Sequence, residues 1–527
     1  MIVVIGDNLL YARKVCYSIN MTSIQKKYRT IFKKSTRNLK LVVLILILWG
    51  IISYTGLYFY LAKSKPEGIY DQVAKAKLYK LLENNVPNLP ERYFGNPDDL
   101  RFDDDHDPCE KYPSLQDLAF NNHFQEMYME DGTSYLYSAH YDDRPLTGNS
   151  EHAMVRILGF INKPEVKVRY YCQLWFKDTS DHALVYMTSI ERLDKELIGE
   201  DDIASYSLIP YMFSCPVPKK YKLMVPDSVS ILEKPCQNLT NNIQIESAEA
   251  STKDNFCVCK LGLEVSDFPD IFDRFIEWMN MLEILGVEKV LLYEEDIDST
   301  IYPMLYYYIN TGFLELIEFK LPDNTGKSSK AVHVNYLTYN DCLYKNIYSY
   351  NYITTLGLNE IIIPKRSLTT WKEVLNLVKA DFRLSKNSVP SSFIFSNAYF
   401  TDTMKSKHET NDKIPSYLIM QQNAYRSTRF SPEQAYIGSI HDTSRAEVLG
   451  MQRIAKCIDT NCYNGYVVPR EGLMHRYQKD MSKCVGETAN SCAVYEMNTT
   501  LDTSIHKYLE GVDIVYKHAV QFVGFKG

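Results

Sequence analysis

The chain has 527 residues, 45% of them hydrophobic, which is enough apolar material for one large hydrophobic core and predicts two. Its formal net charge is −7 and its pI is about 5.9, so no general basic surface is expected and nucleic acid is excluded as an expected partner. The 41 tyrosines suit the flat faces of sugars, but most of them are expected to be core residues.

The N-terminal region predicts one membrane-spanning helix. Residues 41–62 form an uncharged apolar run of 22 residues, which is long enough to cross a bilayer. Seven Lys and Arg residues lie between Lys26 and Lys40, so the positive-inside rule places the basic tail, residues 1–40, in the cytosol. A cleaved signal peptide is the weaker alternative, because the apolar run is long and begins far from Met1. Met21 is an alternative start that the sequence leaves open.

Residues 63–110 predict a stem beyond the membrane. Pro87, Pro90, Pro97 and Pro108 break regular structure in this segment, and aspartates add negative charge. The run Asp103–Asp105 resembles a metal site, but a solvated acidic linker is the better interpretation of such a charge run. The residues after 63 are therefore expected to lie in a lumen or outside the cell, where the sequons at Asn238 and Asn498 predict N-glycosylation.

Cysteine usage agrees with an oxidising compartment. Eleven of the 12 cysteines follow the apolar run, and the odd number predicts one thiol that stays free or bridges to another chain. A zinc site at Cys257-Val258-Cys259 is a poor alternative, because no second cysteine pair accompanies it. The pairs that spacing or placement favours as disulfides are Cys457 with Cys462, Cys484 with Cys492, and Cys172 with Cys215.

Residues 111–250 predict a small β-rich domain. Short apolar runs alternate with turn residues, as in the stretches 134–141, 152–161, 166–176 and 183–190. No cluster of acids or histidines stands out here. A supporting or acceptor-binding role is therefore expected for this domain.

Residues 251–527 change to strands that alternate with long helices. This alternation predicts an α/β domain with a mainly parallel sheet and helices on both faces, whose ligands bind outside the carboxyl ends of the strands. The predicted strands are 256–261, 290–293, 313–319, 352–356 and 361–363, and the predicted helices are 268–285, 301–310 and a segment that starts near 335 and carries Leu343, Ile347 and Tyr350.

Six short motifs in this domain make the chain similar to glycosyltransferase family 92. They occur in order at 274–278, 285–293, 339–344, 425–427, 436–440 and 475. The resemblance implies a GT-A-type fold, a type II Golgi membrane protein, and transfer of galactose from UDP-galactose to a glycan with inversion, assisted by Mn²⁺ or another divalent metal. A metal held by carboxylates would offset the charge that develops on the leaving diphosphate, and a carboxylate or His would deprotonate the acceptor hydroxyl.

The metal motif of the family is degenerate here. Its usual Asp-x-Asp-Glu corresponds to Gly357-Leu358-Asn359-Glu360, so two of its three acids are missing, and the usual Lys of the Tyr-x-Lys-Ser segment is Gly438. The expected metal ligands are Glu360, Asn359, His441 and His475; the nominees for the catalytic base are Glu360, Asp442 and Glu471; and the expected donor-binding residues are Glu277, Glu294, Asp296, Asp298 and Asn359.

Two functions of different classes follow. The first is an active type II glycosyltransferase, and the second is an inactive family 92 protein that binds glycans or a partner. Loss of the acids at 357 and 359 favours the second, whereas the retained Glu360 favours the first. A lectin-like receptor is a third, weaker alternative.

Overall fold

The computed structural model describes seventeen stretches of the chain, and all structural statements refer to them. Residues 1–62, which hold the predicted cytosolic tail and membrane span, lie outside these stretches, as does most of the predicted stem. Within the described part, no helix is both long and apolar enough to span a bilayer. The stretches are 88–94, 111–130, 132–145, 153–163, 169–177, 182–195, 208–247, 255–263, 270–294, 301–323, 331–386, 388–406, 413–433, 436–459, 462–482, 484 and 492–524.

The first half of the described chain folds into one mostly antiparallel sheet, in the path order β6-β5-β9-β10-β3-β4-β8-β7. Successive residues of each strand face opposite sides of the sheet. The apolar side chains on one side pack into a single core, which includes residues from strands at both ends of the sheet. The disulfide between Cys172 on β5 and Cys215 on β8 joins strands that are distant in this order, so the sheet closes around its core. The strands are β1 (Phe120–Asn121), β2 (Phe124–Met129), β3 (Gly132–Asp142), β4 (Met154–Ile161), β5 (Tyr171–Phe176), β6 (His182–Tyr186), β7 (Ser189–Arg192), β8 (Ile209–Pro216), β9 (Pro226–Leu232) and β10 (Ile243–Glu246).

The second half carries an α/β domain around a second sheet. Its strands are β11 (Phe256–Leu261), β12 (Val287–Glu294), β13 (Leu314–Glu318), β14 (Tyr352–Thr355), β15 (Glu360–Pro364), β16 (Ser392–Thr401), β17 (Tyr425–Ser427), β18 (Ile437–Asp442), β21 (Asn464–Val467), β22 (Gly472–Gln478) and β23 (Thr499–Leu501), with a separate hairpin of β19 (Ala446–Leu449) and β20 (Ile454–Cys457). Its helices are α5 (Ile271–Leu285), α6 (Tyr302–Asn310), α7 (Ala331–Asn346), α8 (Trp371–Lys386), α9 (Asp402–Ser406), α10 (Ile419–Gln422), α12 (Val494–Met497) and α13 (Leu509–Val523).

The second sheet is mixed, so the prediction of a mainly parallel sheet is wrong. The strands β13, β12, β11 and β14 are parallel, but β14 pairs antiparallel with β18, and β18 pairs antiparallel with β16. Parallel pairing needs a long crossover, usually a helix. The described helices between β16 and β18, α9 and α10, are short, and β17 lies in the same stretch. Strands β17 and β18 pair antiparallel with β16, whereas β21 and β22 pair parallel with it.

Helices cover both faces of the second sheet, as the alternation predicts. On one face, side chains such as Val258 and Leu292 pack with Trp278, Leu305 and Trp371 from α5, α6 and α8. The other face is covered by α7. Alternate residues of each strand therefore serve different cores, which explains why these strands are apolar almost throughout.

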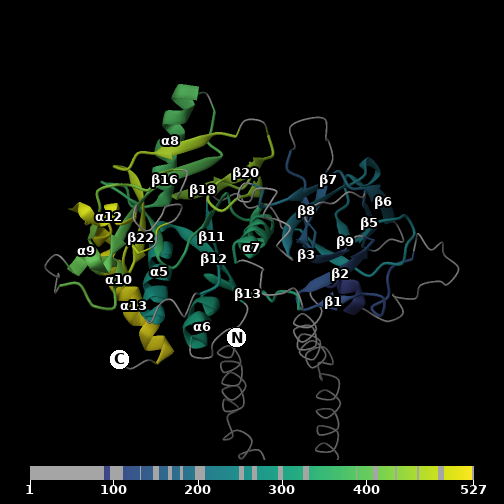
Figure 1. Ribbon diagram of the computed structural model, residues 1–527, viewed down its shortest axis with the longest axis horizontal. Coiled ribbons are helices and arrows are strands. Elements are labelled where there is room, and N and C mark those ends of the chain that lie inside the picture. The colour runs from purple at the N-terminus through teal and green to yellow at the C-terminus, as the bar shows by residue number, and fades with distance from the viewer. Residues whose placement is uncertain are drawn as a thin grey trace, which may run out of the picture. The chain divides into compact units, whose positions relative to one another are not determined.

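Helix α7 lies between the two sheets and ties them into one body (Figure 1). Its apolar residues, among them Tyr336 and Leu337, share a core with Phe160 of β4 and Leu291 of β12. Charged groups reinforce the contact, because His140 of β3 contacts Asp341 of α7 and Arg156 of β4 lies 3.2 Å from Glu447 of β19. The β-rich region is thus a wall of the same core, and it supports α7 directly.

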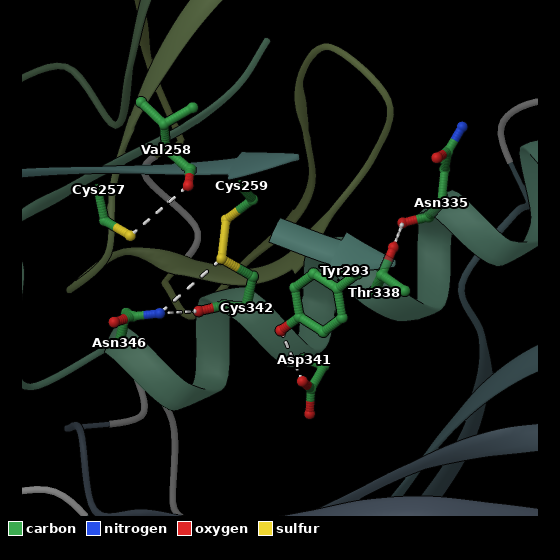
Figure 2. Close-up of a disulfide and its surroundings, with 9 residues drawn as sticks. All are labelled: Cys257, Val258, Cys259, Tyr293, Asn335, Thr338, Asp341, Cys342 and Asn346. Atoms are coloured by element: carbon green, nitrogen blue, oxygen red, sulfur yellow. Dashed lines mark hydrogen bonds between the residues drawn. A yellow bond between two sulfur atoms is a disulfide. The ribbon is translucent and has the colours of Figure 1, made fainter. Parts of the chain in front are cut away.

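The disulfide bonds that the cysteine spacing predicts are present in the structure. The pairs Cys457–Cys462, Cys484–Cys492 and Cys172–Cys215 form as expected, Cys236 is also disulfide-bonded, and Cys257 is the free, buried thiol within the described residues. A further disulfide, Cys259–Cys342, was not predicted, and it links α7 to β11 (Figure 2). Because Cys259 is in this bond, the Cys-x-Cys sequence provides no pair of thiolates for zinc.

Candidate active site at the carboxyl edge of β14

The order of the parallel strands defines where a ligand is expected. Along the sheet these parallel strands lie in the order β13-β12-β11-β14, which is 3-2-1-4 when they are numbered along the chain. Strands β12 and β13 are added on one side of β11, and β14 is added on the other side, so the topology switches between β11 and β14. Doubly wound sheets bind their ligands in the crevice outside the carboxyl ends of the two strands at such a switch point. Here those ends are Leu261 and Thr355, and the tetrapeptide Gly357–Glu360 begins two residues after Thr355.

Local contacts fix the backbone of this tetrapeptide. The Glu360 N–H donates to the Gly357 carbonyl at 3.0 Å and closes a turn. Leu358 is fully buried and anchors the turn in the core, and the Trp278 indole donates to the Glu360 carbonyl at 2.9 Å. The tetrapeptide is therefore held rigidly at the sheet edge, whereas Gly357 and Asn359 remain partly exposed.

The Glu360 carboxylate already has three partners. One oxygen accepts the Gly357 N–H at 2.9 Å, and the other accepts the hydroxyl of Tyr436 and lies 3.0 Å from Nη1 of Arg476. The side chain is 7% exposed. A carboxylate satisfied in this way has a fixed position and a fixed countercharge.

Arg476 is the cation of the site. It lies on β22 directly opposite Glu360 of β15, and its guanidinium carbon is 4.2 Å from the centre of the Tyr436 ring. Burial by itself lowers the pKa of Arg476, but the Glu360 carboxylate and Tyr436 more than offset this effect, so its pKa is raised and the group stays charged. Its Nη1 faces the Glu360 carboxylate, whereas its buried Nε has no hydrogen-bond partner among the described residues.

The residues present do not fit a divalent metal. A side chain added at 357 would start 2.8 Å from Asn359 Oδ1 and 3.4 Å from the Glu360 carboxyl carbon, so these two side chains take up the space beside Gly357. No group of three or more His, Cys, Asp or Glu gathers anywhere in the described ranges. Glu360 is the one carboxylate of the tetrapeptide, and Arg476 neutralises it. A hard cation needs several oxygen ligands, and this edge lacks them.

The two histidines expected as metal ligands lie elsewhere. His441 pairs with Ile353, toward the amino end of β14, and both its nitrogens are hydrogen-bonded, to Ser392 at 2.8 Å and Ser439 at 3.1 Å. His475 is stacked on Phe400 and bonded to Tyr477. Burial lowers the pKa of both histidines to about 3. Because successive residues of a strand face opposite ways, His475 points away from the face that Arg476 occupies.

The other two nominees for the catalytic base are not brought to this edge. Asp442 pairs with Tyr352, and at about 3.3 Å per residue that position is about 16 Å along the strand from Gly357. Its carboxylate accepts the Ser444 N–H and hydroxyl, and burial raises its pKa. Glu471 lies beyond the far end of β15, where its carbonyl accepts the Lys365 N–H. Glu360 alone among the three lies at the tetrapeptide.

The expected donor-binding acids are also dispersed. Glu277 is completely buried in α5 and accepts the N–H groups of Met420 and Gln421 at the start of α10; burial raises its pKa to about 7. Glu294 ends β12, on the same edge of the sheet as the tetrapeptide, and accepts the Leu263 N–H at 2.8 Å. Asp296 and Asp298 lie outside the described residues.

Sequence reasoning missed Arg476 and Tyr436. Both adjoin or belong to family motifs, since Tyr436 begins the 436–440 segment and Arg476 follows His475, but nothing in the sequence links either to Glu360. The structure also explains Gly438, because a Cβ there would lie 2.5 Å from Met474 Sδ and leave no room for the usual Lys. The sequons Asn238 and Asn498 are both exposed, and their glycosylation stays a prediction.

A cleft of about 230 Å³ opens near Tyr436. It begins at Ile437, the next residue, and Tyr466 on its wall is 51% exposed. Glu433 provides a carboxylate at the rim, so the cleft combines an aromatic ring with a hydrogen-bond acceptor. The remaining lining residues are Ile394, Ser396, Val467, Val468 and Pro469.

The topology and the position of the tetrapeptide define an α/β protein whose ligand edge lies at β11 and β14. The family comparison makes this class specific. The model described as Glycosyltransferase family 92 matches residues 255–511, so this part of the chain belongs to glycosyltransferase family 92 and supports a glycosyltransferase at the family level. A search of curated proteins gave no match.

Proposed function

We propose that the chain is a type II Golgi membrane glycosyltransferase that transfers a hexose, galactose from UDP-galactose, to a protein- or lipid-linked glycan with inversion. The family 92 domain supports the reaction class. The observation that carries the proposal is the position of the family's motif tetrapeptide at the switch point between β11 and β14. A nucleotide sugar bound there would place its diphosphate beside the tetrapeptide.

The reaction needs few groups. The acceptor oxygen forms a bond to the anomeric carbon of the hexose, the bond from that carbon to the diphosphate breaks, and UDP leaves with the electron pair. The proton of the acceptor hydroxyl passes to a general base. Glu360 is the nominee at the correct edge, and the cleft lined by Ile437 offers the acceptor an aromatic wall at Tyr466.

Transfer is tested with the full-length chain in detergent. Labelled UDP-galactose and a mixture of detached glycans are expected to give labelled product and free UDP, whereas UDP-glucose and GDP-mannose serve as matched donor controls. Product from UDP-galactose above both controls supports the proposal. Absence of transfer from every nucleotide sugar contradicts it.

Topology is tested separately through the two exposed sequons. Endoglycosidase treatment of the protein made in animal cells should reduce its apparent mass, and a variant with Asn238→Gln and Asn498→Gln should show no reduction. An unchanged mass for the parent chain would contradict a lumenal position for residues after the apolar run.

A second candidate is a family 92 protein without transferase activity. The satisfied carboxylate of Glu360 favours it, because a residue with three partners is poorly placed to take a proton. This alternative predicts that immobilised glycans retain the full-length chain and that no UDP-sugar is consumed. Turnover of any nucleotide sugar would exclude it.

A further inference from the structure

We propose that Arg476 replaces the divalent metal at this edge and binds the diphosphate of the donor directly, so that nucleotide binding needs no metal. The inference rests on the proposed function, because it assumes that a nucleotide sugar occupies the carboxyl edge of β11 and β14. It follows from the disagreement between the family's metal requirement and the groups that the site contains.

The guanidinium is positioned before any ligand arrives. Glu360 lies 3.0 Å from its Nη1, and the Tyr436 ring lies against its face at 4.2 Å. Tyr436 also donates its hydroxyl to Glu360, so the three side chains form a closed group. Such a group needs little reorganisation when an anion binds, and a planar guanidinium matches the spacing of phosphate oxygens.

The buried Nε of Arg476 indicates that an acceptor is missing. The side chain is 18% exposed and its Nη1 lies 3.0 Å from the Glu360 carboxylate, yet its buried Nε donates no hydrogen bond to a described residue. Burying such a donor without an acceptor is unfavourable, and for a charged group the cost is larger. Phosphate oxygens are strong acceptors and carry the charge that a guanidinium prefers. A diphosphate therefore satisfies both the hydrogen-bond donors and the charge.

The role of Glu360 is reversed under this inference. In a metal site its carboxylate would attract the cation that holds the diphosphate, and removing its charge would weaken nucleotide binding. Here it orients Arg476 but repels the diphosphate. Neutralising Glu360 should therefore strengthen binding, and the two mechanisms predict changes of opposite sign.

The test is UDP binding to the full-length chain in detergent, measured by calorimetry in EDTA and again with MnCl₂. We expect the parent chain to bind UDP in EDTA, with an affinity that Mn²⁺ changes by less than about twofold. Arg476→Gln should weaken binding by about tenfold or more, and Arg476→Lys should weaken it less because the charge remains. Glu360→Gln should strengthen binding by about threefold or more.

Arg426→Gln is the matched control. Arg426 lies 2.8 Å from Asp502 in a similar ion pair, and its side chain is 15% exposed. Since Phe400 pairs with Arg426 and Tyr399 with Arg476, the two arginines leave the sheet on opposite faces. The control should therefore lose a comparable ion pair and retain UDP affinity within about twofold.

The outcomes separate this inference from the proposed function. UDP binding that appears only with Mn²⁺, or that survives Arg476→Gln, or that is lost in Glu360→Gln, overturns the inference and leaves a nucleotide-binding protein. No UDP binding by the parent chain under either condition overturns the proposed function itself. If Arg476→Gln does not fold, as judged by circular dichroism, the sign of the Glu360→Gln effect decides.

Discussion

Two buried carboxylates, Asp341 on α7 and Glu360 on β15, have different surroundings. Asp341 on α7 accepts a hydrogen bond from Tyr293 of β12 at 2.7 Å (Figure 2). It also accepts one from His140 of β3 at 3.0 Å, so its partners come from both sheets. Glu360 pairs with Nη1 of Arg476, and the buried Nε of this arginine has no acceptor among the described residues. The comparison indicates that the first group holds the fold together, whereas the second is prepared for a ligand.

The largest effect is expected from the disulfide beside Asp341. Cys259→Ser with Cys342→Ser should lower the free energy of unfolding by about 4 kcal/mol, because the bond closes a loop of 83 residues in sequence separation. The matched control is Cys457→Ser with Cys462→Ser, where the separation is five residues and a loss of about 2 kcal/mol is expected. Urea unfolding measures both. An equal or larger loss for the short loop would contradict the structural role of the α7 bond.

Asp341→Asn should lower the free energy of unfolding by about 3 kcal/mol. The amide keeps one acceptor oxygen but leaves one of the buried donors, from His140 or Tyr293, unsatisfied. Glu130→Gln, in an exposed pair with Lys234, should change stability by less than about 1 kcal/mol. Equal losses in the two variants, measured by urea unfolding, would show that Asp341 does not join the sheets.

The pH dependence of stability gives an independent measure of the same carboxylate. Burial by itself raises the pKa of Asp341, but Lys345 and His140 more than offset it and lower the pKa from 3.8 to about 2. Because the folded pKa is below the ordinary value, the stabilisation is complete above about pH 4 and is lost as pH falls toward 2. We expect a loss of about 2 kcal/mol in this window. Asp341→Asn should lack this step; an identical pH profile would contradict the assignment.

The smallest effect tests the tetrapeptide as the remnant of a metal site. Gly357→Asp with Asn359→Asp restores the missing acids and should raise Mn²⁺ affinity at least about tenfold, measured by titration of the metal's electron paramagnetic resonance. Asn359→Asp alone, which adds one carboxylate, should gain less. A double variant that binds Mn²⁺ no better than the parent would show that the motif is misplaced.

The sequence predicted the first elements of the α/β domain well. The apolar run 256–261 is β11 as expected, and the predicted segments at 290–293 and 352–356 fall on β12 and β14. Periodicity succeeds there because each strand is buried on both faces and each helix is long. It failed for the later strands, whose direction depends on how short connections fold back and not on their own residues.

The candidate site was predictable only in part. The family motif located residues 357–360, and the 3-2-1-4 order of strands places them at the ligand edge. The partners of Glu360 were not predictable, because Arg476 reaches it through the pairing of β15 with β22 and Tyr436 reaches it from the residue before β18, and no local pattern encodes either contact. Conversely, Asp442, Glu471 and His441 carry the right chemistry but occupy the opposite ends of their strands.

The most direct test of the account is a crystal structure of the chain grown with UDP-galactose in EDTA. The account predicts the diphosphate at the carboxyl ends of β11 and β14, with its oxygens within hydrogen-bond distance of Nε or Nη1 of Arg476. A nucleotide bound at any other edge of the sheet, or one held there by a metal with Arg476 still paired only to Glu360, would contradict it.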